Sequence, residues 1–113
     1  MIYRKCEHVS EARENMRGGD GAAKLTALAP DLPENLRLFS EIRLDPGCSI
    51  GYHVHENETE LFYFISGSGV VMDGEDEIKI SAGDTMATPS GSGHSVKNDG
   101  AGPLVFVAVI VLD

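Results

Sequence analysis

The sequence lacks the features typical of several protein classes. Its 113 residues contain no tryptophan and two cysteines, and nine basic residues stand against 18 acidic ones, for a net charge of -9. A surface of this sign repels phosphate groups, and no basic cluster offsets it, so we expect neither nucleic acid nor an anionic membrane as a partner. The length suits one domain with a single core.

Long hydrophobic runs are also missing. The longest, Leu104 to Leu112, falls well short of the ~20 residues of a membrane-spanning helix. The N-terminus carries charges from Arg4 onward and has no apolar signal-peptide core, which predicts a cytoplasmic protein. Cys6 and Cys48 show no CxxC spacing, so we expect two reduced thiols. The alternative for Cys48, which closely precedes a histidine, is a place at the edge of a pocket.

The rest of the sequence predicts an all-β fold. Leu36 to Leu44 alternates between apolar and polar residues, as a half-buried strand does. Asp73-Gly74 predicts a tight hairpin turn, and the closing valine-rich run predicts a strand buried on both faces. Further short strands are expected over 23–29, 61–65, 70–72, 77–80 and 85–88. Because glycine-rich turns separate them and helical periodicity is nearly absent, we expect an antiparallel sandwich or barrel.

Residues 1–21 are expected to form an N-terminal arm, and residues 22–113 the barrel. Ser10 to Arg17 is polar and predicts a short helical turn or a mobile segment, after which Gly18-Gly19-Asp20-Gly21 interrupts any regular element. Such an arm either frays or adds its apolar end, Ile2 and Tyr3, to the edge of another sheet.

Two histidines separated by one residue are the main functional signal. On a strand, His53 and His55 leave the same face with Cα atoms roughly 7 Å apart, a spacing that suits metal chelation. The polar stretch Glu56 to Thr59 predicts a turn, after which Glu60 opens a strand that can fold back beside the first. A carboxylate would then face two imidazoles, and His94 is the only later histidine.

Each of these residues also has a simpler interpretation. A single histidine in a β protein is usually a surface or hydrogen-bonded residue, as we expect for His8, and the closely spaced pair could be solvated. Glu56 and Glu58 compete with Glu60 for the carboxylate role. Because only Glu60 opens the returning strand, we interpret the other two as solvated turn residues.

The intervals between these residues resemble both motifs of the cupin family. The first motif places two histidines and a glutamate between two glycines, and the matching residues are Gly47, His53, His55, Glu60 and Gly67. The second motif is matched by Gly83, Pro89, Gly91, His94 and Asn98. The resemblance implies a small single-domain cupin, which is a double-stranded β-helix or jelly-roll barrel.

The resemblance also implies a ligand set for one divalent metal inside the barrel: His53, His55, Glu60 and His94. Three neutral imidazoles and one carboxylate suit Mn, Fe, Co, Ni, Cu or Zn better than Ca or Mg. On a six-coordinate ion, about two positions would stay open for water or a chelating ligand. Since small cupins are often dimers, a homodimer is the expected assembly, and Asn98 is expected to tie the last turn to the barrel.

Strand alternation predicts which side chains line the pocket. If Glu60 points inward, Phe62 and Phe64 do so as well, and Tyr63 points outward. We expect both phenylalanines to line a substrate pocket together with Phe106. Arg37 or Arg43 would bind a substrate carboxylate if its face pointed inward, but alternation directs both to solvent.

Two functions are compatible with these residues. We favour a metal-dependent enzyme, an isomerase, lyase, decarboxylase or dioxygenase that acts on a small oxygen-rich acid or sugar derivative. The alternative is a module that binds or senses a metal or small ligand without turnover, because cupins host many chemistries. No catalytic residue is identified, since the sequence places no additional general acid or base near the metal.

Overall fold

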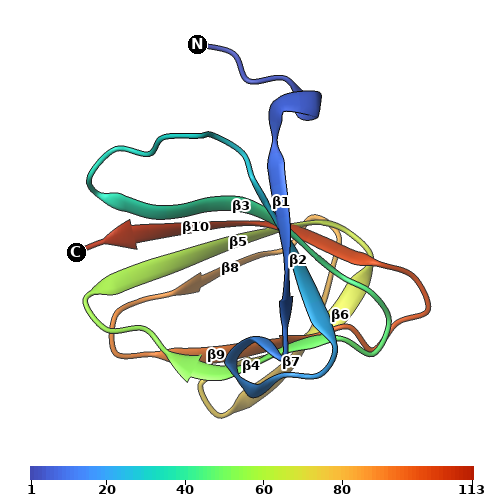
Figure 1. Ribbon diagram of the computed structural model, residues 1–113. Helices are drawn as coiled ribbons and strands as arrows, with labels where there is room; N and C mark the ends of the chain where they lie inside the picture. Colours follow the sequence, from blue (N-terminus) through green and yellow to red (C-terminus); the bar gives the residue numbers. More distant parts are fainter.

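The computed structural model describes residues 1–113 as two antiparallel β-sheets that face each other (Figure 1). The six-stranded sheet has the order β1-β2-β3-β10-β5-β8, and the four-stranded sheet has the order β4-β9-β6-β7. The strands are β1 (Val9–Glu14), β2 (Ala22–Ala27), β3 (Leu36–Leu44), β4 (Ser49–Val54), β5 (Glu58–Ser66), β6 (Ser68–Asp73), β7 (Asp76–Ser81), β8 (Thr85–Thr88), β9 (Gly93–Lys97) and β10 (Leu104–Leu112).

Two 3-10 turns, η1 (Lys5–Glu7) and η2 (Met16–Gly18), are the only helical elements. Neither is long and apolar enough to cross a membrane. The all-β prediction is therefore confirmed, and the fold is the expected double-stranded β-helix.

The core lies between the two sheets and contains the alternate residues of their strands. On β10, Leu104, Phe106 and Ala108 are completely buried, whereas the valines between them are partly exposed. The prediction that this strand is buried on both faces is thus wrong for its outer face. Burial of each large apolar side chain contributes about 1.5–3 kcal/mol, so the inner face of β10 is a major source of stability.

Local turn and strand predictions agree closely with the structure. The strands expected over 36–44 and 85–88 coincide with β3 and β8. The predicted hairpin joins β6 to β7, where Asp73 pairs with Asp76. Gly74 in this turn has a φ of +60°, a conformation that glycine adopts without steric cost.

The strand after the histidines does not fold back beside the first, contrary to expectation. β4 pairs with β9 in the four-stranded sheet, whereas β5 pairs with β10 and β8 in the six-stranded sheet. β5 also starts at Glu58 instead of after a longer turn. The segment between β4 and β5 therefore crosses from one sheet to the other, and Glu60 faces the histidines across the interior of the sandwich.

The polar segment of the N-terminal arm is mainly a strand, which corrects the expected helical turn or mobile segment. β1 pairs with β2 from Val9 opposite Ala27 to Glu14 opposite Ala22, across the expected boundary between arm and barrel. All six residues of β1 are exposed, because β1 is an edge strand with little packed against it. Without a buried face it has no apolar alternation, so no strand is indicated here by periodicity.

Candidate metal centre

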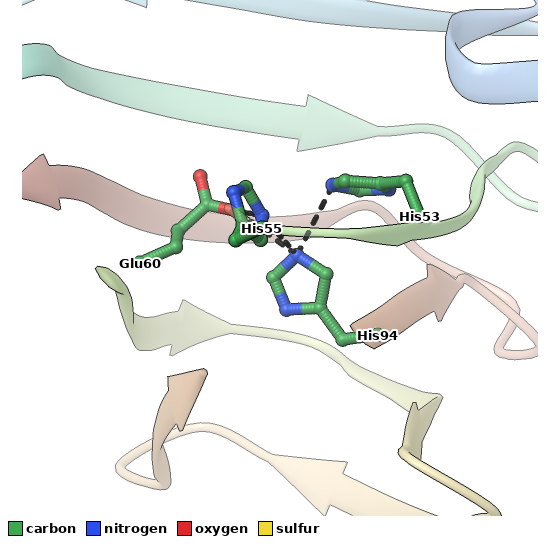
Figure 2. A group of neighbouring side chains, drawn as sticks. All are labelled: His53, His55, Glu60 and His94. Carbon is green, nitrogen blue, oxygen red and sulfur yellow. Dashed lines mark hydrogen bonds and ion pairs between the residues drawn. The ribbon is translucent and has the colours of Figure 1, made fainter. Parts of the chain in front are cut away.

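The four residues of the expected metal site converge in the interior (Figure 2). His53 lies on β4 and pairs in register with His94 on β9. His55 follows β4 directly, and Glu60 comes from β5 in the opposite sheet. One potential ligand atom from each residue lies within 4.8 Å of the others, so both sheets contribute to one cluster.

The closest contacts in the cluster join the inward-facing atoms. His94 Nε2 lies 3.0 Å from His55 Nε2 and 3.2 Å from His53 Nε2. Glu60 Oε1 lies 3.0 Å from Nε2 of both His55 and His94. Donor atoms bound side by side on an octahedral ion, at bond lengths of about 2.1 Å, would lie roughly 3.0 Å apart. The spacing of the donor atoms therefore fits a transition-metal ion.

The outward-facing nitrogen of each ring has its own polar partner. His53 Nδ1 lies 2.7 Å from the carbonyl oxygen of Gly51, and His55 Nδ1 lies 2.7 Å from Glu58 Oε2. Both oxygens only accept hydrogen bonds, so each Nδ1 carries the proton. His94 Nδ1 lies 2.7 Å from the hydroxyl oxygen of buried Thr88, which can accept a third such bond. This arrangement directs the Nε2 lone pairs toward the centre.

Convergence of these lone pairs calls for a positive charge. His55, Glu60 and His94 are 3%, 6% and 1% exposed, respectively, so water cannot separate their electron-rich atoms. In these mostly buried surroundings the mutual repulsion of three imidazole nitrogens and a carboxylate oxygen is only weakly screened, and a cation between them would relieve it. The donor set, three nitrogens and one oxygen, suits first-row transition metals. These residues therefore fit the metal that the motifs imply.

Burial also keeps His53 neutral. Loss of solvation is the largest influence on its pKa and lowers it below the ordinary value of 6.5, against the hydrogen bond to Gly51, which raises it. The nearby His94, His55 and Arg17 lower the pKa further. A neutral imidazole is the form that binds a metal, so the environment favours the binding-competent form of this residue at neutral pH.

Glu58 is part of the site, which corrects its interpretation as a solvated turn residue. Its side chain is 13% exposed and pairs with both His55 and Arg37. The hydrogen bond from Arg37 is the main reason that the pKa of Glu58 lies below its ordinary value. Glu58 and Glu60 share a face of β5. A predicted strand that began at Glu58 would therefore have placed its side chain on the same side as Glu60.

A cavity of about 250 Å³ opens beside the cluster. It is lined by apolar side chains and by three arginines in addition to the four clustered residues. The lining residues are Arg13, Met16, Arg17, Leu25, Arg37, Leu38, Ile42, Ile50, His53, His55, Glu60, Phe62, His94, Val96 and Ile110. Two of the arginines come from the N-terminal segment, which the motifs do not cover.

Arg37 lines this cavity while its side chain stays 47% exposed, although alternation along β3 predicts a side chain directed to solvent alone. The pairing of β3 with β10 shifts register next to this residue: Leu38 pairs with Ile110, and Leu36 with Val111. Arg37 is the extra residue of this bulge, and a bulge changes the direction of a side chain. Arg43 follows the prediction, because it is half exposed and pairs with Asp45 at the surface.

The three phenylalanines expected in the pocket lie at different depths. Phe62 lines the cavity, and its ring stacks on that of His94 with centroids 5.0 Å apart and an interplanar angle of 15°. Phe64 and Phe106 have no exposed surface and are absent from the cavity wall, and each packs against Phe62 from the core side. They therefore support the wall behind Phe62.

The remaining residues singled out from the sequence lie outside the cavity. Asn98 is fully buried, and its side-chain nitrogen donates to the carbonyl oxygens of Leu44 and Gly102, which confirms that it ties the last turn to the barrel. Cys6 is exposed, and Cys48 is a free, partly buried thiol packed against the core.

Several known proteins are similar to this chain in sequence and fold. The Cupin domain family matches residues 40–110. The chain is 40% identical over 114 residues to the oxalate-binding protein of Thermotoga maritima, and the match covers 99% of this chain and 94% of that protein. The crystal structure of a predicted oxalate decarboxylase from Thermotoga maritima, also 40% identical, covers 100% of both chains with a TM-score of 0.92.

A more distant likeness has the same architecture. A putative sugar phosphate isomerase from Acidithiobacillus ferrooxidans is 27% identical, and the match covers 80% of this chain and 59% of that one with a TM-score of 0.72. The two motifs, the facing antiparallel sheets and these similarities agree. This chain belongs to the cupin family.

Proposed function

We propose that the protein holds one divalent transition-metal ion on His53, His55, Glu60 and His94 and binds a small chelating dicarboxylate, such as oxalate, beside it. The observation that carries this proposal is the buried convergence of three imidazole lone pairs and one carboxylate oxygen. The similarity to a protein named for oxalate binding supports the choice of ligand. The metal is Mn, Fe, Co, Ni, Cu or Zn, among which this donor set does not discriminate.

The groups around the cavity would bind the metal, orient the imidazole rings and exclude water. A metal held by the four clustered residues would supply Lewis-acid chemistry to a chelating ligand in the cavity. Gly51, Glu58 and Thr88 hold the three imidazole rings in place through Nδ1. Phe62 and the aliphatic lining keep water away, and in these less polar surroundings the attraction between ligand and site is stronger than in bulk water.

Binding without proton transfer is better supported than acid-base catalysis. Apart from the proposed ligands, the cavity lining consists of apolar residues and arginines. An arginine stays protonated, so it supplies no general base. An isomerase or decarboxylase would have to obtain its proton elsewhere. A dioxygenase is the second candidate, because the lining fits a reaction that takes place at the metal without a protein acid or base.

Elemental analysis followed by thermal unfolding tests the proposal. We expect about one equivalent of a transition metal per chain, and we expect oxalate to raise Tm only in the metal-loaded protein. At a ligand concentration of 100 Kd the added stability would be about 2.7 kcal/mol. NMR of the same mixture separates binding from turnover, because oxalate that stays intact excludes catalysis on it. Absence of metal after reconstitution would refute the proposal.

We also propose that the chain forms a homodimer through the outer face of the six-stranded sheet. Leu61, Tyr63 and Ile65 point outward on β5 and are 42%, 53% and 44% exposed. The outward valines of neighbouring β10 extend this apolar strip. A contiguous apolar patch of this kind favours association with another protein surface.

A further inference from the structure

The three arginines at the cavity differ in their partners. Arg13 forms an ion pair with Glu11 at 2.7 Å, and Arg37 forms one with Glu58 at 2.8 Å. The side chain of Arg17 is exposed and forms no hydrogen bond or ion pair with another side chain or with the backbone. In a protein with a net charge of -9, a guanidinium group that lines a cavity without a carboxylate partner is available to a ligand.

The backbone around Arg17 is held in an uncommon conformation. Arg17 has a φ of 55° and a ψ of 29°, in the left-handed region, which costs a residue with a side chain about 1 kcal/mol or more. The Asn15 side chain donates to the carbonyl oxygen of Gly19 at 3.0 Å. The Gly18 and Gly19 amides donate to the carbonyl oxygens of Asn15 and Met16. The loop is therefore closed by its own hydrogen bonds.

Two glycines let this loop lie directly against β4 (Figure 1). A Cβ atom on Gly51 would overlap the carbonyl oxygen of Arg17, and one on Gly19 would overlap that of Ser49. The carbonyl oxygen of Gly51 also accepts the hydrogen bond from His53 Nδ1. Gly51 of β4 thus contacts both the loop that carries Arg17 and the proposed metal ligand His53.

We infer that Arg17 binds the carboxylate oxygens of the ligand that face away from the metal and so makes the site selective for dianions. The inference rests on the proposed function, because it requires a ligand chelated at the metal. Three neutral imidazoles, one carboxylate and a divalent ion sum to one positive charge, and Arg17 adds a second. A dianion matches both charges, whereas a monoanion matches one and leaves the exposed guanidinium of Arg17 to water.

The size of the cavity agrees with a short diacid. About 250 Å³ holds several groups of the size of water, at about 30 Å³ each. Oxalate and malonate fit this space. In this arrangement Arg17 discriminates between ligands of different charge. It lies on a loop outside both cupin motifs.

Titration calorimetry on the manganese-loaded full chain tests the inference, with oxalate as the dianion and glycolate as a chelating monoanion. We expect Arg17→Gln to weaken oxalate binding about tenfold or more, as for loss of a charged hydrogen bond, and to change glycolate binding less than twofold. Metal content should be unchanged. Arg43→Gln, which removes an exposed arginine outside the cavity, is the matched control and should leave both affinities intact.

A second variant separates the guanidinium from its backbone. Arg17→Gly suits the positive φ, so it should unfold at the same Tm or higher and still lose oxalate affinity. Oxalate affinity equal to wild type in both metal-loaded variants would overturn the inference and leave the proposed function standing. Wild-type protein that binds manganese but neither oxalate nor glycolate would overturn the proposed ligand, and the inference with it.

Discussion

Among single residues, Glu58 has the widest influence on the site without being one of the four clustered ligands. It accepts from His55 Nδ1 and from Arg37, and so connects a proposed metal ligand to the cavity wall. A carboxylate on the outer nitrogen fixes the ring orientation and raises its basicity. Two glutamates of β5 therefore belong to one site: buried Glu60 as a proposed ligand and partly buried Glu58 as the support of His55.

Glu58→Gln should weaken metal binding by roughly 10–100-fold, because the amide supports His55 less well than a carboxylate. A competition assay with a fluorescent chelator measures the change. Glu56→Gln provides the control, since Glu56 is exposed and forms no side-chain ion pair or hydrogen bond. Equal affinities in the two variants would contradict the role given to Glu58.

The stability of the metal-free protein should fall with decreasing pH in two steps. The pKa of His53 is lowered from 6.5, so below about this pH the unfolded chain binds more protons than the folded one, and stability decreases. The pKa of Glu58 is lowered from 4.5, so its stabilising contribution is present above that pH and is lost as pH falls through the folded value. Urea unfolding at pH 7.5, 5.5 and 4 measures both steps, and equal stability at the first two pH values would refute the first.

At the scale of elements, irregularities of pairing position the functional side chains. The register of β4 against β9 shifts between Ile50 and His53, and that of β3 against β10 shifts beside Arg37. Each extra residue changes the direction of the side chains that follow. Gly51 lies in the irregular part of β4, between Ile50 and His53, and it is also the residue of β4 that contacts Arg17 of η2.

Gly51→Ala should displace the loop around η2, since the new Cβ would overlap the carbonyl oxygen of Arg17. We expect a loss of about 1–3 kcal/mol in the free energy of unfolding, measured by urea denaturation. Gly102→Ala is the matched control, because a Cβ there meets no atom within 4 Å, and its effect should stay within about 0.5 kcal/mol. Similar stabilities of the two variants would show that the loop does not depend on this close approach.

At the scale of the whole molecule, the site joins the two sheets. His53 and His94 come from the four-stranded sheet and Glu60 from the six-stranded sheet, so a bound ion would link both halves of the sandwich. The outer face of the six-stranded sheet lies on the far side of β5 from the site. One strand therefore carries the proposed metal ligand inward and the proposed dimer contact outward.

Leu61→Lys should convert the proposed dimer to a monomer, because a charge in an apolar interface loses its hydration without gaining a partner. Sedimentation equilibrium measures the mass of the particle. Lys79→Glu alters the charge of an exposed residue on the other sheet and should leave the mass unchanged. A wild-type protein that sediments as a monomer would refute the homodimer.

The strands with one buried face and the hairpin at Asp73-Gly74 follow from the amino-acid sequence alone. These depend on local properties: side chains alternate along a strand with a period of two, and glycine permits tight turns. The spacing of the two histidines and the strand that follows them indicated His53, His55 and Glu60, and the resemblance to the cupin motifs implied the full set with His94.

The sheet that each strand joins and the surroundings of the site depend on long-range packing. β5 pairs with β10 instead of β4, a choice made by packing across the core that local alternation does not encode. A bulge places half-exposed Arg37 beside the cavity, and the pairing of exposed β1 with β2 brings Arg17 to its lining. Both effects arise from contacts between residues far apart in the chain, so strand periodicity and motif spacing indicated the four clustered residues but not the arginines.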